Sequence, residues 1–275
     1  MEAVLPQRRR TPFAQPPVIR FKNLGSGSSG NATVVQARSE TTVTHLLVDC
    51  GLGIRQLEMR LGLAGMLAEQ IDAIFVTHEH ADHIGCARQL AVRERIPVYM
   101  SHGTYTALGE PDFDGLLRIA CDSMAIEVGA MQVIPFTVPH DAREPLQLTC
   151  GDGAARLGVL TDLGHCTAHV LSHLAGCGTL LLECNHDAGM LESGSYPFFL
   201  KRRVGGAYGH LANDASAAIA KALIATGLQQ VVAAHLSEQN NKPELARRAL
   251  AAAMACDEAE IHVADGPRGY AWLTA

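Results

Sequence analysis

The feature that most limits how this chain can fold is a run of histidines and an aspartate directly after an apolar stretch. Residues 71–76 are mostly apolar, and His78, His80, Asp82 and His83 follow within a few positions. Imidazole and carboxylate groups at this density are the ligands that Zn²⁺ and Mn²⁺ favour. A buried strand ending here would let the first two histidines reach one ion, and Asp82 and His83 a second. We therefore predict a strand followed by a loop that binds two divalent metal ions, zinc or manganese.

Residues 77–85 (Thr-His-Glu-His-Ala-Asp-His-Ile-Gly) resemble the HxHxDH motif of the metallo-β-lactamase-fold hydrolases. The resemblance extends from about residue 18 to the end of the sequence. It implies an α/β (α+β) fold built as an αβ/βα four-layer sandwich, with two mixed sheets face to face and helices outside. We expect a disordered tail over residues 1–17 and a single metallo-β-lactamase-fold domain over residues 18–275.

The resemblance also implies the remaining metal ligands, each just after a predicted strand: His140, Asp162 and His235. Each ion would have three ligands of its own, namely His78, His80 and His140 for the first ion, and Asp82, His83 and His235 for the second. Asp162 would bridge the ions, because a carboxylate has two oxygens to share. Asp49, which matches the aspartate of the family's first motif, would orient a ligand histidine through its ring N–H.

Two ions about 3.5–4 Å apart can hold a hydroxide between them, and this hydroxide is the expected nucleophile. The ions also neutralise charge that develops on the attacked oxygen. Asp82 is predicted to be a catalytic residue as well as a metal ligand. The expected reaction is therefore hydrolysis.

A glutamate and a histidine further along the chain resemble a second catalytic feature. Glu183 ends the apolar run 179–183, and His210 precedes a predicted helix. In the tRNA 3′-processing nucleases of this fold, a similar pair is thought to protonate the leaving alkoxide. A histidine oriented by a carboxylate suits this role. The alternative is that both residues are capping or packing groups.

Several further segments resemble the YycJ/WalJ group of metallo-β-lactamase-fold proteins. They are residues 20–31, 183–187, 196–203, 209–211 and 234–237. That group is associated with 5′→3′ exonuclease action on double-stranded DNA and favours Mn²⁺. The resemblance implies a phosphodiesterase with DNA as its substrate and a link to DNA repair.

Nine other residues are predicted to contact the substrate. The Gly-rich loop at residues 25–30 can turn backbone N–H groups toward an anion, although a tight turn between strands explains it equally well. The basic run 201–203 can contact the DNA backbone, although it can also be a solvated patch. The candidates are Ser26, Ser28, Asn31, Arg143, Asn185, His186, Lys201, Arg202 and Arg203.

Composition limits where such a protein works. The 275 residues carry a net charge of −6, which favours no broad nucleic-acid-binding face. No apolar run is long enough to cross a membrane. The eight cysteines form no CxxC pair, and the first 17 residues lack the apolar segment of a secretory signal. We expect reduced thiols and a cytoplasmic protein, and the sequence predicts no oligomeric state.

The hydrophobic pattern predicts strands first and then alternating helices and strands. The predicted strands are residues 18–23, 32–37, 45–49, 71–76, 98–101, 124–128, 131–138, 146–150, 155–160, 179–183, 230–234 and 260–263. The predicted helices are residues 53–63, 85–94, 167–174, 214–226 and 243–254. Each half of the chain thus supplies a sheet with flanking helices, which is consistent with the sandwich.

Three other functions are compatible with the sequence. A thioester or lactone hydrolase of the glyoxalase II kind uses nearly the same metal loop. A small-nucleotide phosphodiesterase would suit the negative net charge. A metal-bound regulatory protein without turnover is the alternative outside enzymes. The Glu183/His210 pair and the basic run favour a phosphate substrate over a thioester.

Overall fold

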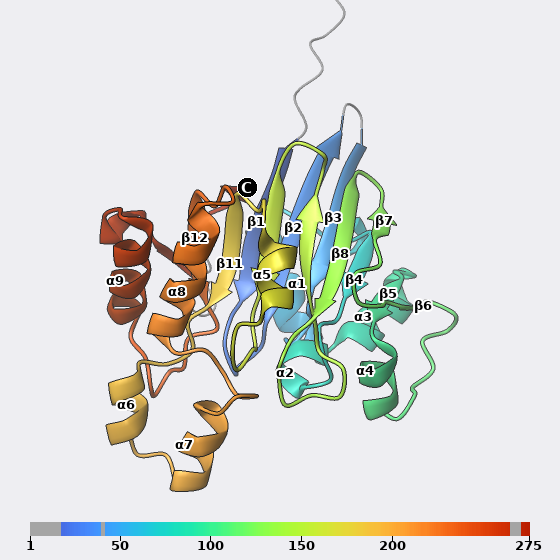
Figure 1. Cartoon of the computed structure of the whole chain (residues 1–275). Coiled ribbons are helices and arrows are strands. Elements are labelled where there is room, and N and C mark those ends of the chain that lie inside the picture. The colour runs from blue at the N-terminus through green and yellow to red at the C-terminus, as the bar shows by residue number, and fades with distance from the viewer. Residues whose placement is uncertain (1–17, 40–41, 265–270) are drawn as a thin grey trace, which may run out of the picture.

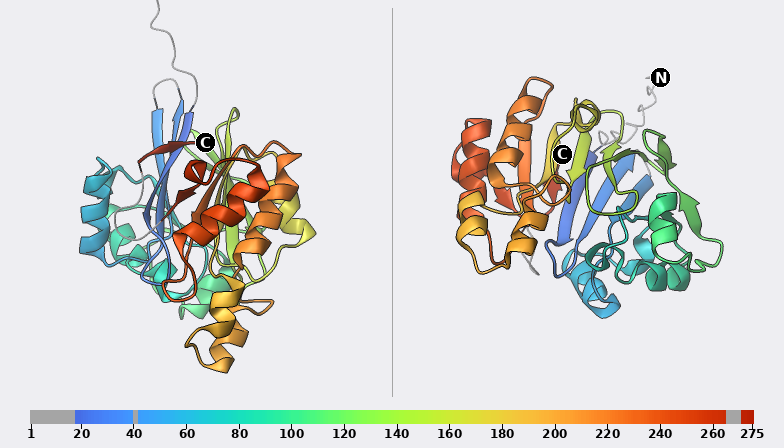
Figure 2. Two further views of the ribbon diagram at one scale, coloured as in Figure 1. Left: turned by 90° about the vertical axis from the view of Figure 1, so that its left-hand side faces the viewer. Right: turned by 60° about the horizontal axis from the view of Figure 1, so that its bottom comes forward.

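A computed structural model of the chain describes residues 18–39, 42–264 and 271–275. Two sheets of seven strands each lie face to face, with helices on their outer surfaces (Figure 1). In the left view of Figure 2, helices of the N-terminal half flank one side of the sheets and helices of the C-terminal half flank the other. The predicted four-layer sandwich is confirmed.

The first sheet has the strand order β14-β1-β2-β3-β4-β5-β6. Its β1, β2 and β3 are antiparallel, whereas β3 to β6 are parallel. The strands are β1 (Val18–Gly25), β2 (Ala32–Ser39), β3 (Thr42–Val48), β4 (Ala73–Phe75), β5 (Val98–Met100), β6 (Leu117–Ile119) and β14 (Leu273–Thr274). The associated helices are α1 (Ile54–Leu63), η1 (Ala68–Gln70), α2 (Ala81–Ile84), α3 (Ala87–Glu94) and α4 (His102–Ala107).

The second sheet has the order β13-β12-β11-β10-β9-β8-β7, antiparallel from β7 to β10 and parallel from β10 to β13. Its strands are β7 (Ile126–Val128), β8 (Met131–Thr137), β9 (Leu146–Gly151), β10 (Arg156–Leu160), β11 (Thr179–Glu183), β12 (Gln230–Ala234) and β13 (His262–Val263). The helices of this half are α5 (Ala168–Leu174), α6 (Ala188–Ser193), α7 (Phe198–Val204), α8 (Asn213–Ile224), α9 (Pro243–Met254) and η2 (Glu258–Glu260).

Three apolar layers hold the sandwich together. One cluster packs between the sheets and includes Phe21, Phe75 and Leu148. The other two lie between each sheet and its helices. Strand β11 is buried along its whole length, as expected for a central parallel strand covered on both faces. These layers fix the strands whose carboxyl ends carry the candidate ligands.

The structure contains short elements that the hydrophobic pattern did not predict: β6, β14, α4, α6 and α7. The predicted strand 98–101 ends one residue early, because the Ser101 hydroxyl accepts a hydrogen bond from Thr104 N and begins α4. The predicted strand 260–263 begins late, because Glu260 Oε1 accepts from Asp257 N and closes a turn of 3₁₀ helix.

The cysteines, the membrane-spanning segments and the N-terminal tail were the subjects of expectations from composition. All eight cysteines are free thiols, and the sulfurs of Cys50 and Cys86 share a hydrogen bond at 3.4 Å and form no disulfide. Among the described residues, no helix is long and apolar enough to cross a membrane. The predicted tail, residues 1–17, lies outside the described part of the chain.

Candidate metal centre

Three strands end in residues with an unusual backbone conformation. Asp49 follows β3, Asp162 follows β10 and His235 follows β12, and their φ angles are 60°, 55° and 54°. Residues with a side chain seldom take this left-handed conformation, which persists where the surroundings enforce it and is frequent at functional sites. The same strained turn thus places three polar side chains at one end of the sandwich.

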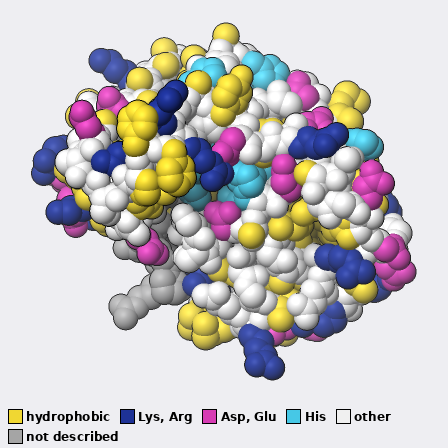
Figure 3. All heavy atoms as spheres, turned by 90° about the horizontal axis from the view of Figure 1, so that it is seen from below, with side chains coloured by type: hydrophobic (Ala, Val, Ile, Leu, Met, Phe, Trp, Pro, Cys, Tyr) yellow, Lys and Arg dark blue, Asp and Glu magenta, His cyan; other side chains and the backbone are white. Residues whose placement is uncertain are grey.

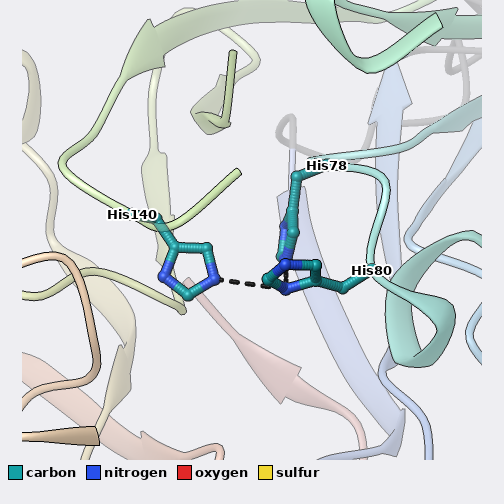
Figure 4. Close-up of side chains that lie close together, drawn as sticks. All are labelled: His78, His80 and His140. Atoms are coloured by element: carbon teal, nitrogen blue, oxygen red, sulfur yellow. Dashed lines mark hydrogen bonds between the residues drawn. The ribbon is translucent and has the colours of Figure 1, made fainter. Parts of the chain in front are cut away.

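Three histidines form the first cluster (Figure 4). His78 and His80 lie on the loop after β4, and His140 lies on the loop after β8. His80 Nδ1 is 3.0 Å from His78 Nε2 and 3.4 Å from His140 Nε2. The far nitrogen of His140, Nδ1, donates to Gly209 O at 3.1 Å, which leaves Nε2 as a ligand atom. The arrangement matches the first predicted ligand set.

The second cluster contains Asp82, His83 and His235. Asp82 Oδ2 lies 3.7 Å from the Nε2 atoms of both His83 and His235. Their other ring nitrogens point outward to carboxylates: His83 Nδ1 is 2.7 Å from Asp49, and His235 Nδ1 is 3.1 Å from Glu183. Carboxylates in these positions fix the ring orientation and leave Nε2 free for a cation.

Asp162 lies between the two clusters. Its Oδ2 is 3.1 Å from His83 Nε2 and its Oδ1 is 3.5 Å from His235 Nε2. One oxygen of Asp162 also lies within 4.8 Å of ligand nitrogens of both His78 and His83. The buried atoms Asp162 Oδ2 and His235 Nε2 make no hydrogen bond to any described residue. Leaving buried polar atoms unpaired is unfavourable, and a bound cation would pair with both of them.

The buried carboxylates draw positive charge into the clusters. Burial alone would lower the pKa of His235, but Asp162, Asp82 and Glu183 raise it to about 10. Burial would also lower the pKa of His83, but Asp162 and Asp49 raise it well above its ordinary value. By contrast, burial and the neighbouring His83 hold the pKa of His78 well below its ordinary value. A divalent cation meets the same demand for positive charge by displacing imidazole protons, so the donor set fits metal ions.

The Asp49 carboxylate connects the first sheet to this centre. It accepts hydrogen bonds from Thr77 N at 2.9 Å and Thr77 Oγ1 at 3.0 Å, besides its contact with His83. We expect Asp49→Asn to weaken metal binding about 10- to 100-fold, because an amide cannot hold the imidazole as a carboxylate does. Metal content after dialysis against a graded chelator measures this. Equal retention by the variant and the unaltered chain would contradict the role.

Glu183 and His210 lie beside the second cluster. Glu183 Oε1 is 2.7 Å from His210 Nδ1, and Glu183 Oε2 accepts from Leu163 N and Leu211 N. Burial opposes ionisation of Glu183, but His210 and His235 lower its pKa to about 2. Burial also works against a charge on His210, but Glu183 and Asp162 raise its pKa. Since Nδ1 is held, Nε2 is the nitrogen of His210 that can face a substrate.

A cleft of about 380 Å³ opens over the clusters. Among the candidate substrate contacts, Ser28 and Arg203 line it. Asp141, which the sequence did not single out, also lines it, lies 3.4 Å from His140 and pairs with Arg203 at 2.6 Å. A larger hollow of about 650 Å³ runs along β8 and β9, but its lining includes none of the candidate ligands.

Three predicted substrate contacts use their polar atoms within the protein. Ser26 Oγ accepts from His235 N at 2.7 Å, and Asn185 Nδ2 donates to His235 O at 3.0 Å. Asn31 Nδ2 donates to Asp82 O at 3.2 Å, and its Oδ1 accepts from Gly27 N. The Gly-rich loop therefore positions Asp82 and His235, and only its Ser28 lines the cleft.

The remaining candidates lie away from the cleft lining. Arg143 is exposed and its backbone N–H donates to Glu79 Oε1. His186, Lys201 and Arg202 line a second pocket on the other side of α7. These four residues therefore do not line the cleft over the metal clusters, and their predicted contacts with the substrate stay predictions. Sequence reasoning also missed Thr77, whose Oγ1 lies 3.0 Å from His78 Nδ1, although it directly precedes the first ligand.

Close backbone packing holds the metal loop in place. A Cβ atom on Gly51 would lie 1.7 Å from Asp82 O. We expect Gly51→Ala to destabilise the fold by more than about 3 kcal/mol, because backbone atoms cannot give way as side chains do. Gly53→Ala is the matched control, since nothing lies within 4 Å of its added Cβ, and should shift stability by less than about 1 kcal/mol. Urea unfolding measures both, and equal midpoints would contradict the tight packing.

Comparison with known proteins agrees with this geometry. The model of the Beta-lactamase superfamily domain matches residues 44–236. The chain belongs to the beta-lactamase superfamily. It is 33% identical over 233 residues to the exodeoxyribonuclease YycJ of Bacillus anthracis, which covers 83% of this chain and 86% of that protein. It is 30% identical over 233 residues to the exodeoxyribonuclease WalJ of Streptococcus pneumoniae, covering 82% and 85%. As a member of this superfamily, the chain is a metal-dependent hydrolase.

Solved structures share the fold. The metallo-β-lactamase-fold protein YhfI from Bacillus subtilis superposes with a TM-score of 0.73 at 16% identity, covering 94% of this chain and all of that one. A diphosphatase of the PhnP family gives 0.64 at 20% identity, covering 94% and 97%. The short form of human tRNase Z gives 0.62 at 16% identity, covering 92% and 98%. The predicted membership of the metallo-β-lactamase-fold proteins is confirmed.

Proposed function

We propose that this chain is a two-metal phosphodiesterase that cleaves DNA, as a 5′→3′ exonuclease. The observation that carries the proposal is the Glu183–His210 pair, joined at 2.7 Å beside Asp162, with His210 open to the cleft. A leaving alkoxide needs a proton, whereas a thiolate leaves readily without one. The pair therefore favours phosphodiester over thioester hydrolysis.

The proposed ligands are those that the structure brings together. His78, His80 and His140 would hold one ion, Asp82, His83 and His235 the other, and Asp162 would contact both. Zn²⁺ or Mn²⁺ bound by these residues would supply an activated water and would neutralise charge on the attacked phosphate. The contacts of Asp49, Glu183, Ser26 and Asn185 with these residues keep the donor atoms converged before substrate binds.

The chain's own groups complete the reaction. His210 Nδ1 is held by Glu183, so its Nε2–H is the proton given to the leaving oxygen. Glu183 stays ionised because His210, His235 and two backbone N–H groups surround it. Arg203, paired with Asp141 at the cleft wall, can turn its remaining N–H groups toward a phosphate oxygen. These roles require a substrate with a basic leaving group.

The relatives support DNA as the substrate. Two proteins with 30–33% identity over most of their length are named exodeoxyribonucleases. A small nucleotide is the closer rival, because the net charge is −6 and the cleft is of nucleotide size. A link to DNA repair is part of the proposal and rests on the resemblance to these nucleases.

A pair of chromogenic assays tests the class of reaction. We expect the Mn²⁺- or Zn²⁺-loaded chain to hydrolyse bis-p-nitrophenyl phosphate and to leave a glutathione thioester intact. Chelation should abolish the first activity, and metal return should restore it. Faster hydrolysis of the thioester than of the diester would contradict a phosphodiesterase and favour the glyoxalase II-like alternative.

A further inference from the structure

Helix α7 carries an unusual exposed surface next to the metal cleft. Among the large apolar side chains that the described residues expose, the aromatic ones are Phe198, Phe199 and Tyr208, at 76%, 73% and 62% exposure. All three lie on α7 or just after it. No residue of α7 is buried, and together with α6 it extends from the lower end of the sandwich (Figure 1). Exposing aromatic faces to water is unfavourable, so this concentration calls for a ligand.

Basic side chains accompany these aromatic rings. Arg202 and Arg203 are four residues after Phe198 and Phe199, so each arginine shares a helix face with one phenylalanine. The Arg202 guanidinium lies 5.8 Å from the Phe198 ring centre. Seen from below, hydrophobic and basic side chains interleave next to the histidines (Figure 3). A ring beside a guanidinium suits a base stacked on the ring with its phosphate on the cation.

Helix α7 also separates two hollows. Leu200, Arg203 and Val204 line the metal cleft. Phe198, Lys201 and Arg202 line a second pocket of about 510 Å³, together with His186 and Glu192. A strand whose phosphate lies in the cleft can therefore continue over α7 into the second pocket. Both hollows are of the size that holds small-molecule or nucleotide groups.

One buried group points to a polar ligand in the second pocket. His186 lines the pocket and is only 4% exposed. Its Nδ1 is buried without a hydrogen-bond partner among the described residues. Buried ring nitrogens are normally paired, and a base edge or a phosphate oxygen could pair with this one. The lining also holds one acidic group, Glu192, which can accept from the N–H groups of a base, and two basic groups, Lys201 and Arg202, which can bind its phosphate.

We propose that α7 is a stacking platform for unpaired nucleotides of a nucleic-acid strand, with one base on Phe198 at the second pocket. The proposal rests on the phosphodiesterase function and adds that unpaired or terminal nucleotides of the DNA are the ones that α7 binds. Bases within a duplex are already stacked and paired, so an aromatic platform can only hold unpaired or terminal ones. A net charge of −6 fits such local recognition of an end and not a broad duplex-binding face.

The test measures binding of a single strand that carries 2-aminopurine, whose fluorescence is quenched by stacking. We expect Phe198→Ala/Phe199→Ala to lose the quenching and to bind the strand about 10-fold or more weakly. Phe198→Trp/Phe199→Trp should retain both, since indole also stacks. Met59→Ala/Leu63→Ala removes two exposed apolar side chains of α1 and is the matched control, with binding as in the unaltered chain. Far-ultraviolet circular dichroism verifies that each variant is folded.

The salt dependence of binding separates stacking from charge. The alanine pair should leave the slope of log affinity against log salt unchanged, whereas Arg202→Gln should reduce it by about 1. Quenching and affinity that survive the alanine pair would overturn the platform. The platform would also be overturned if the unaltered chain forms a dimer and the Phe198→Ala/Phe199→Ala variant is monomeric. The two rings would then be a self-association surface. If the platform variants weaken binding but the unaltered chain cuts no DNA, the proposed function fails and the platform stands.

Discussion

Asp162→Ala is expected to lower phosphodiester hydrolysis by more than about 10³-fold, well beyond the roughly 10- to 100-fold losses from residues that only orient a ligand. Asp162 lies between the two clusters, is 2% exposed, and contacts His83, His210 and His235. Removing it takes away the one carboxylate that would be shared between the two clusters, although Asp82 and Glu183 remain beside the histidines. The rate on bis-p-nitrophenyl phosphate and the bound metal per chain are the two measurements.

Asp152→Ala is a suitable control for this prediction, since Asp152 is a loop aspartate that lines the larger hollow away from the clusters. Its rate and metal content should match those of the unaltered chain. An Asp162→Ala protein that keeps both its metal and its rate would show that the clusters are not the active centre.

His210→Ala is expected to slow cleavage of DNA by about 10²- to 10⁴-fold, the usual contribution of a general acid. The same change should slow cleavage of bis-p-nitrophenyl phosphate far less, because p-nitrophenolate leaves as a stable anion without a proton. The expected result is therefore a difference between the two substrates and not a uniform loss. Comparing kcat on both substrates, for the variant and the unaltered chain, measures it.

The structure also permits a different role for His210. One nitrogen of His210 lies within 4.8 Å of ligand atoms of Asp162, Glu183 and His235, so it could itself be a metal ligand. Metal content distinguishes the roles: a proton donor leaves it unchanged, whereas loss of a ligand lowers it. Equal losses on both substrates, together with lost metal, would contradict the general-acid role.

The sequence predicted the clusters in two ways. Four of the ligands form a short motif just after an apolar run: His78, His80, Asp82 and His83. The other three ligands were implied by the family resemblance, and each lies close after a predicted strand. The contacts of Ser26 with His235 are different, because the two residues are 209 positions apart and only the packed fold joins them. Such distant pairings leave no local pattern, which is why Ser26, Asn31 and Asn185 were interpreted as substrate contacts.

Helix α7 shows a second limit of sequence reasoning. Helices are predicted from a buried apolar face, but α7 buries no residue and exposes Phe198 and Phe199. The basic run 201–203 was interpreted as one phosphate-binding unit. On a helix, successive residues point about 100° apart. Arg203 therefore faces the metal cleft, while Lys201 and Arg202 face the second pocket.

Digestion of a 5′-phosphorylated, end-labelled DNA duplex by the Mn²⁺-loaded chain, beside Asp162→Ala, is the decisive test of the proposed exonuclease function. We expect stepwise loss of nucleotides from the 5′ end that chelation and Asp162→Ala abolish. An intact duplex in the presence of a chain that still cleaves bis-p-nitrophenyl phosphate would contradict the claim and identify a small phosphodiester as the substrate.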